Sequence, residues 1–235
     1  MALPEQRNGN VAVPRALEIK YRVAEIAMGL FLEQGYENVT VEAVAEASAV
    51  SRRTVFRHFA GKDELPFPDH AERIRLLEAQ LTMPDEGGDP IDVVIAATQT
   101  TMHDFMSRPE LVLRRYRLTR LVPQLREREL IEHERYVIRT RAFLRRHLPA
   151  DAAPYMAPAI AALIDSVHRS TLGDWTRSDG GIDAVGRMQE GMEWARRVLA
   201  SADGARLPQM LVAVVPDNFA TREAMVALRR AADEV

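Results

Sequence analysis

Cysteine is absent from this chain of 235 residues, which excludes disulfide bonds, thiol catalysis and zinc sites built on thiolates. The chain also lacks any run of about 18 uncharged apolar residues, so no transmembrane helix is predicted. Its first residues lack the apolar core of a signal peptide, which indicates no export and predicts a cytoplasmic protein.

The chain also lacks a strong excess of positive or negative charge. The chain carries 31 lysines and arginines against 34 aspartates and glutamates, which gives a formal net charge of −3. This balance argues against a globally basic surface that coats DNA without sequence preference. Any affinity for DNA must therefore come from the local placement of charge.

A catalytic constellation is also missing. The sequence contains no glycine-rich phosphate loop and no nucleophile elbow. Six histidines are spread along the chain: His58, His70, His103, His133, His147 and His168. Asp165 and His168 could supply two metal ligands or an acid–base pair, because they stand one helical turn apart. A structural hydrogen bond between helices is the preferred interpretation, so we predict no enzymatic activity, no metal and no cofactor.

The most specific pattern in the chain lies at residues 35–62. It predicts two short helices, at about 41–48 and 52–59, that are joined by a tight turn. Thr40 and Ser51 stand just before these helices, where a hydroxyl can accept a hydrogen bond from an orphan backbone N–H. The layout is typical of a helix-turn-helix, which places its second helix in the DNA major groove.

The second of these helices divides into distinct faces. Val55 and Phe59 are four residues apart and face the predicted core, while Arg53 and Arg57 share a neighbouring stripe. No acidic residue lies between Arg52 and Lys62. Arginine suits both phosphate and the O6/N7 edge of guanine, so this face is a candidate DNA-reading surface. A solvated basic face on an ordinary helix is the alternative.

The segment resembles the signature of the tetracycline-repressor (TetR) family of bacterial transcription factors. The family motif is long and ungapped, and the resemblance covers about residues 16–65. The residues that fall on the motif in register are Gly35, Tyr36, Thr40, Val41, Ala45, Val50, Ser51, Thr54, His58, Phe59, Lys62 and Leu65.

The resemblance implies a role for each matching position. Thr40 and Lys62 would hold phosphates at the starts of the second and fourth helices. The residues that would lie at the groove are Ser51, Arg52, Arg53, Thr54, Phe56, Arg57 and His58. Two positions depart from the motif. Ala49 replaces the usual turn glycine, so the turn must either avoid a positive φ or carry strain. Phe56 stands where tyrosine is common, and it cannot donate a hydrogen bond to phosphate.

The remainder of the chain is predicted to be helical as well. A first helix is expected at 16–34, and Pro66, Phe67 and Pro68 should break the helix that the family starts near Lys62. Asp69 and Glu72 fit a capping box for a new helix that ends near Leu81. Further helices are expected at about 90–107, 109–120, 124–148, 154–177 and 182–202.

The predicted organisation is an all-α protein in four parts. Residues 1–14 form a flexible arm, 15–65 the three-helix DNA-binding domain, and 66–205 a helical ligand-binding and dimerisation domain. Residues 206–235 form an extension of uncertain structure. Within it, the run LPQMLVAVVP at 207–216 favours a strand over a helix, followed by a closing helix at about 220–233. A buried extended segment is the alternative to strand pairing across a dimer axis.

A ligand pocket is predicted among the C-terminal helices. Bulky, adaptable side chains that suit an apolar ligand occur at Met102, Phe105, Met106, Tyr116, Met156, Leu163, Trp175 and Trp194. Ordinary core packing is the alternative for each of them. The resemblance implies that a pocket exists, but not which residues line it.

An arginine-rich stretch raises a second possibility for the ligand. Residues 114–146 hold eleven arginines against four glutamates, with Arg114, Arg115, Arg117 and Arg120 in one short region. Such a cluster could bind an anionic effector, for example an acyl-CoA, and a solvated face is the alternative. Residues 62–67 also resemble regulators of the mycofactocin-associated subgroup, some of which respond to acyl-CoA.

Together these patterns predict a homodimeric one-component transcriptional regulator that acts as a repressor. It would bind a palindromic operator, would dimerise through about 154–177 and 182–202, and would be released by a small apolar or amphipathic effector. Two alternatives stay open: a DNA-binding regulator controlled by a protein partner, and an enzyme on a helical scaffold.

Overall fold

The structure is a computed structural model that describes residues 15–84 and 87–202. Within these ranges every regular element is a helix, which confirms the predicted all-α class. None of the helices in these ranges combines the length and the apolar character needed to cross a bilayer. The predicted flexible arm at 1–14, the strand at 207–216 and the closing helix at 220–233 lie outside the described residues.

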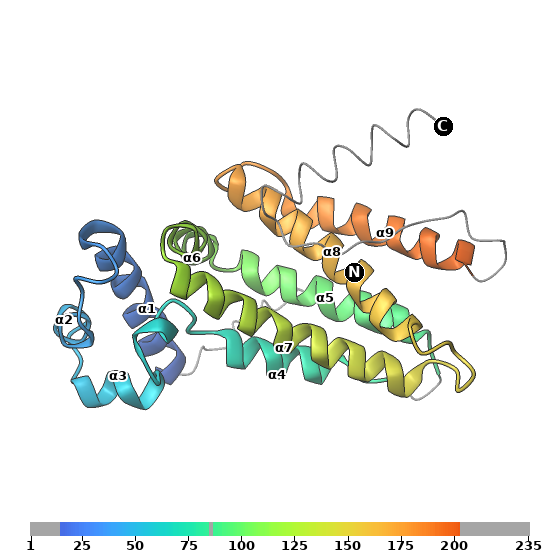
Figure 1. Ribbon diagram of the computed structural model, residues 1–235, viewed down its shortest axis with the longest axis horizontal. Coiled ribbons are helices and arrows are strands. Elements are labelled where there is room, and N and C mark those ends of the chain that lie inside the picture. The colour runs from blue at the N-terminus through green and yellow to red at the C-terminus, as the bar shows by residue number, and fades with distance from the viewer. Residues whose placement is uncertain (1–14, 85–86, 203–235) are drawn as a thin grey trace, which may run out of the picture.

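Three helices form a unit at one end of the molecule (Figure 1). They are α1 (Arg15–Gln34), α2 (Val41–Ala47) and α3 (Arg52–His58), each within two residues of its predicted bounds. They share an apolar core because each presents its apolar stripe to the other two. Its buried residues include Val23, Ala27 and Phe31 of α1, Val44 of α2, and Val55 and Phe59 at α3.

Both predicted N-caps are present. The hydroxyl of Thr40 accepts a hydrogen bond from the backbone N–H of Ala43 at 3.1 Å, and that of Ser51 accepts one from Thr54 at 3.1 Å. Each cap satisfies one of the backbone donors that the first helical turn leaves unpaired. Because each cap lies one residue before its helix, the two short helices start where the sequence predicts.

The turn between α2 and α3 carries the strain that was one of the two predicted outcomes. Ala49 adopts φ of +53°, in the left-handed region that costs an L-residue about 1–2 kcal/mol. Its backbone N–H donates to the carbonyl of Glu46 at 3.0 Å, and that of Val50 to Ala45 at 3.0 Å. These two bonds close the end of α2 and hold Ala49 in this conformation.

Replacing Ala49 by glycine is therefore expected to raise the free energy of unfolding by about 0.5–1 kcal/mol. The free energy gained by relieving the left-handed strain exceeds the free-energy cost of the extra backbone entropy that glycine has in the unfolded chain. Ala43→Gly, in the exposed interior of α2, should instead lower it by about 0.5–1 kcal/mol. Urea denaturation compares the two variants, and equal destabilisation by both would contradict the assigned strain.

The chain leaves α3 through a short 3₁₀ turn, η1 (Lys62–Glu64), and then breaks before α4 (His70–Gln80). This confirms the helix break predicted at Pro66, Phe67 and Pro68. The predicted capping box at the start of α4 is wrong, because the side chain of Asp69 makes no capping hydrogen bond. Its carboxylate is buried instead, where it pairs with Arg73 and Arg115.

The remaining described helices form a bundle that extends away from α1–α3 (Figure 1). They are α5 (Pro90–Met106), α6 (Pro109–Leu121), α7 (Pro123–His147), α8 (Met156–Arg177) and α9 (Ala184–Ala202). Each predicted helix is present, and three of them start on a proline whose missing N–H costs nothing there. Helix α7 runs from the side of the N-terminal unit along the bundle, while α8 and α9 lie against each other.

The N-terminal unit is packed directly onto the bundle. Its apolar core is completed by Leu111 and Leu118 of α6 and by Leu125 near the start of α7. These side chains are 1%, 1% and 0% exposed. The core therefore continues across the boundary predicted at residue 65, so that a change in the bundle can reach the N-terminal unit through direct contact.

Candidate nucleic-acid interface

Helix α3 presents a polar outer face and an apolar inner face, as predicted. Val55 is 1% exposed and Phe59, just after the helix, is 3% exposed, whereas Arg53 and Arg57 are on the surface. Phe56 is 44% exposed, which leaves it able to contact an apolar group such as a thymine methyl.

The arginines of this face differ in their partners. Arg52 forms an ion pair with Glu42 of α2 at 2.8 Å, and its guanidinium lies 5.3 Å from the ring centroid of Phe56. Arg53 and Arg57 form no ion pair with any carboxylate of the described residues. These two side chains are therefore the cations of α3 that remain available to phosphate or to a guanine edge.

The other predicted contact residues surround this pair. The Ser51 and Thr54 hydroxyls are hydrogen bonded to each other at 2.9 Å, so both are tied to the helix start. Burial lowers the pKa of His58 from its usual value, and the charges of Arg57 and Lys20 lower it further. His58 is therefore neutral at pH 7, when it carries one donor and one acceptor.

Lys62 and Thr40 flank the face. The ammonium of Lys62 lies 4.2 Å from the ring centroid of Tyr36 and 5.6 Å from that of Phe31, so cation–π contacts hold it in place. It begins η1, where a phosphate contact was expected. Thr40 is exposed at the start of α2, and its hydroxyl serves as the N-cap described above.

Comparison with known proteins connects this geometry to a family. A model described as bacterial regulatory proteins, tetR family, matches residues 25–66, which contain the second half of α1 and all of α2, α3 and η1. Over residues 25–66 this chain is therefore similar to the bacterial regulatory proteins of the tetR family. The match covers the helix-turn-helix and the exposed arginines of α3, as the sequence motif predicted.

Two curated relatives match over the same region. The HTH-type transcriptional regulator TcmR of Streptomyces glaucescens is 38% identical over 76 residues, or 32% of this chain and 34% of the relative. MftR of Mycobacterium tuberculosis, a transcriptional regulator named for mycofactocin biosynthesis, is 31% identical over 61 residues, or 26% of this chain and 31% of the relative. The matches thus span about a third of each relative's length, and these relatives are regulators rather than enzymes.

Solved structures extend the likeness to the whole fold. The SmeT–triclosan complex has a TM-score of 0.56 at 18% identity, and covers 85% of this chain and 100% of that one. FadR of Thermus thermophilus, a TetR-family repressor in complex with lauroyl-CoA, has a TM-score of 0.52 at 18% identity over the same shares. At this identity the likeness establishes the fold alone: an N-terminal helix-turn-helix unit followed by a helical C-terminal domain.

The predicted pocket residues are divided among several parts of the C-terminal core. Phe105, Met106 and Trp175 meet in one cluster, while Met102, Met106 and Met156 belong to another. Tyr116 lies under the guanidinium of Arg120, and Leu163 is buried on α8. Met102 also lines a cavity of about 120 Å³ between α5 and α9, together with Gln99, His103, Val185, Met188 and Gln189. The other seven predicted residues do not line it.

The arginines at 114–120 do not converge on one site. Arg115 is 4% exposed and pairs with Asp69 in the core, whereas Arg117 pairs on the surface with Asp179 at 2.6 Å. Arg120 stacks on Tyr116, with 4.7 Å from its guanidinium to the ring centroid. Three of the four side chains are thus already engaged by other residues, and the compact anion site that the sequence suggested is not formed.

A buried ion-pair network that sequence reasoning missed joins α4, α5 and α6. Arg73 pairs with Asp69 at 2.8 Å and with Asp104 at 2.5 Å, and Arg115 pairs with Asp69 at 3.3 Å. Burial acts to raise the pKa of Asp69, but Arg115 and Arg73 lower it more, so the net pKa is below its usual value. Only the four-residue spacing of Asp69 and Arg73 was a visible signal for this network.

Asp165, which was considered together with His168 as a metal or acid–base pair, pairs instead with His133. Its carboxylate on α8 lies 3.2 Å from Nε2 of His133 on α7, an interhelical contact of the preferred structural kind but with a different histidine. In the part of the chain that the structure describes, no group of three or more potential ligands gathers as a metal site would require.

The stability of the protein is expected to fall as the pH is lowered from 6.5 to 4. Burial lowers the pKa of His168 to about 4, although Asp165 acts in the opposite direction. The unfolded chain protonates this histidine near pH 6.5, so it binds more protons than the folded state within this window. His168 alone would lower the free energy of unfolding by up to about 3 kcal/mol. Burial also lowers the pKa of His70, which adds to the effect.

Denaturation at a series of pH values measures this slope. A His168→Gln variant should show a shallower dependence between pH 6.5 and 4, because its side chain cannot take up a proton. Equal steepness in the variant and the wild type would contradict a neutral, buried His168.

Proposed function

We propose that this chain is a one-component transcriptional regulator that binds a palindromic operator as a homodimer and acts as a repressor released by a small-molecule effector. The observation that carries the proposal is the exposed pair Arg53 and Arg57 on the capped helix α3, within a domain that matches the tetR family. Such a regulator acts in the cytoplasm, where its DNA lies.

The DNA-binding mode follows from the placement of these side chains. Arg53 and Arg57 would enter the major groove, while Lys62 and Thr40 would fix the register on phosphates. Two copies of α3 would enter successive major grooves, whose centres are about 34–36 Å apart. Dimerisation is proposed through α8 and α9, and the 45% exposure of Trp194 on α9 supports an interface there.

The effector is proposed to be apolar or amphipathic, and an acyl-CoA is an anionic candidate. The methionine-rich core of the C-terminal domain supports an apolar ligand, and the fold likeness to the lauroyl-CoA complex of FadR supports an acyl chain. The likeness to MftR over 61 residues supports a place near the mycofactocin-associated subgroup.

The cavity of about 120 Å³ is smaller than a site for a drug-sized ligand, which needs about 300 Å³ or more. Helices α5 and α9 would therefore move apart to admit the effector.

The small cavity also favours a second candidate. A DNA-binding regulator with no small ligand, controlled by a protein partner, would need no larger space among these helices. The two candidates share the DNA-binding domain and differ only in what releases it.

Selection of DNA from a random duplex library by the full-length wild-type chain tests the proposal. We expect enrichment of a palindromic sequence that the protein binds as a dimer at a stated salt concentration. Release of this duplex by one of a panel of acyl-CoAs and apolar metabolites would identify the effector class, while release by none would favour the protein-partner candidate. Failure to enrich any sequence would refute the assignment of α3 to the major groove.

A further inference from the structure

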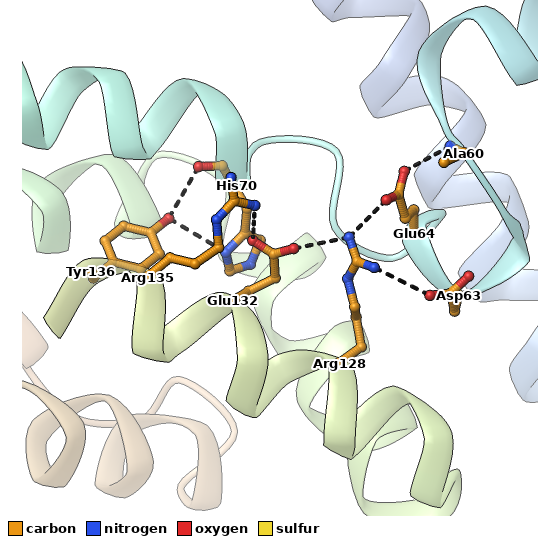
Figure 2. Close-up of polar contacts among 8 residues, drawn as sticks. All are labelled: Ala60, Asp63, Glu64, His70, Arg128, Glu132, Arg135 and Tyr136. Carbon is orange, nitrogen blue, oxygen red and sulfur yellow. Dashed lines mark hydrogen bonds and ion pairs between the residues drawn. The ribbon is translucent and has the colours of Figure 1, made fainter. Parts of the chain in front are cut away.

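A charged cluster joins the end of the DNA-binding domain to helix α7 (Figure 2). Arg128 of α7 reaches across to η1, where its Nη2 donates to Glu64 Oε1 at 2.7 Å and its Nη1 to Asp63 Oδ2 at 3.4 Å. On its own helix, Nη2 also pairs with Oε1 of Glu132 at 2.9 Å. One guanidinium from the C-terminal domain thus engages both carboxylates of the turn that follows the DNA-reading helix.

Glu64 carries this connection to the end of α3. Its second oxygen, Oε2, accepts a hydrogen bond from the backbone N–H of Ala60 at 2.7 Å. Ala60 lies two residues after His58, the last residue of α3. The two oxygens of Glu64 therefore hold the chain that leaves α3 and the guanidinium of α7 at the same time (Figure 2).

The cluster is shielded enough from water to constrain how η1 lies against α7. The side chains of Arg128 and Glu64 are each 26% exposed, and that of Glu132 is 4% exposed. Charge-assisted hydrogen bonds of this kind are about twice as strong as neutral ones. By contrast, the pair of Arg139 with Glu78, which joins α7 to α4, is 35% and 49% exposed. Such an exposed pair contributes little.

The connection can nevertheless be released. Glu132 Oε2 also accepts from Arg135 Nη1 at 3.0 Å, so the buried carboxylate keeps a partner if Arg128 leaves it. Arg128 is itself partly exposed and can be hydrated. Tyr136, about two turns beyond Arg128 on α7, places its hydroxyl 3.4 Å from the carbonyl oxygen of His70 at the start of α4. This contact would continue to hold α7 to α4 when Arg128 leaves η1.

We propose that Arg128 is a positioning residue for DNA recognition, which fixes the orientation of α3 relative to α7 through Glu64. The inference rests on the proposed function, since it assigns the route by which a movement of α7 alters the DNA-reading surface. In this role Arg128 binds Glu64 of the DNA-binding domain, and not a ligand.

Removal of the Glu64 charge distinguishes a positioning role from a simple electrostatic effect, because the two predict opposite changes in DNA affinity. Glu64 is a carboxylate that stands two residues from Lys62, beside the surface proposed to face DNA. If it were only a nearby negative charge, its removal would strengthen binding to a polyanion. If it positions α3, its removal weakens binding. A glutamine at this site can accept only one of the two hydrogen bonds, because its other terminal atom is an NH₂ donor.

The test measures the affinity of full-length variants for the duplex that the wild-type chain selects from a random library. We expect Arg128→Gln and Glu64→Gln each to lower this affinity about tenfold, within the range of typical coupling between sites. Two controls remove the same charges elsewhere. Arg139→Gln breaks the ion pair between α7 and Glu78 of α4 and should leave the affinity unchanged. Glu37→Gln removes an exposed carboxylate from the same domain and should leave the affinity unchanged or raise it.

Circular dichroism and thermal unfolding establish that each variant is folded, and if Arg128→Gln is not, Glu64→Gln alone decides. Wild-type or tighter binding by Glu64→Gln, in line with Glu37→Gln, would overturn the positioning role while leaving the proposed function intact. A wild-type chain that selects no sequence would overturn the proposed function and this inference together.

Discussion

Replacing Arg53 and Arg57 together by alanine is expected to weaken binding to the selected duplex at least about thirtyfold. Both side chains are exposed on one stripe of α3, and neither is paired with a carboxylate of the described residues. Loss of an arginine that reads a guanine costs about 1–3 kcal/mol, and two such losses on one helix should at least approach their sum. Fluorescence anisotropy at fixed salt measures the change.

A matched variant controls for the loss of two positive charges. Arg145 and Arg146 are exposed at the end of α7 remote from α3 (Figure 1). Arg145→Ala with Arg146→Ala should leave the affinity within about twofold of the wild type, because screening weakens charges beyond about 10 Å at 0.1 M salt. Equal losses in both double variants would show that net charge, and not the α3 face, determines binding.

Replacing Asp69 by alanine is expected to lower the free energy of unfolding by about 3–5 kcal/mol. The Asp69 side chain is 1% exposed and pairs with Arg73 and Arg115, which are 2% and 4% exposed. Without it, Arg115 loses its carboxylate partner in the core and Arg73 keeps only Asp104. The guanidinium of Arg115 would then remain in a poorly solvated site without a carboxylate partner, and denaturant unfolding at pH 7 would report the loss.

An exposed ion pair provides the comparison. Asp92 pairs with Arg196 at 2.6 Å, but the two side chains are 56% and 43% exposed. Asp92→Ala should therefore cost at most about 1 kcal/mol. If Asp69→Ala cost no more than this, water would have to reach the core arginines, and the network would not anchor α4 to α6.

The helices and the exposed arginine face of α3 could be predicted because their signals are local. A cap such as Thr40 or Ser51 acts within one turn of its own helix, and the prolines at 90, 109 and 123 act at the first helical position. The stripe of Arg53 and Arg57 likewise depends only on the helical period. These features lie at the same residues in the structure as in the sequence prediction.

The polar connections could not be predicted, because their partners are distant in sequence. Asp69 has the spacing of a capping box with Glu72, yet its carboxylate lies in the core beside Arg115, 46 residues away. The charge pattern predicted that Arg115, Arg117 and Arg120 share one site. In the structure, the packing of α6 directs them to three different partners. Arg128 and Glu64 are 64 residues apart.

The sequence by itself determined the all-helical architecture, the helix bounds and the likeness of the helix-turn-helix to the tetR family, since each depends on residues within a few turns of one another. The tertiary structure alone decided which charges are buried, which arginines of α3 pair with a carboxylate, and how α7 is tied to the end of α3. Those outcomes depend on which helices pack together, because only packing removes water from a charge and brings a distant partner within hydrogen-bonding distance.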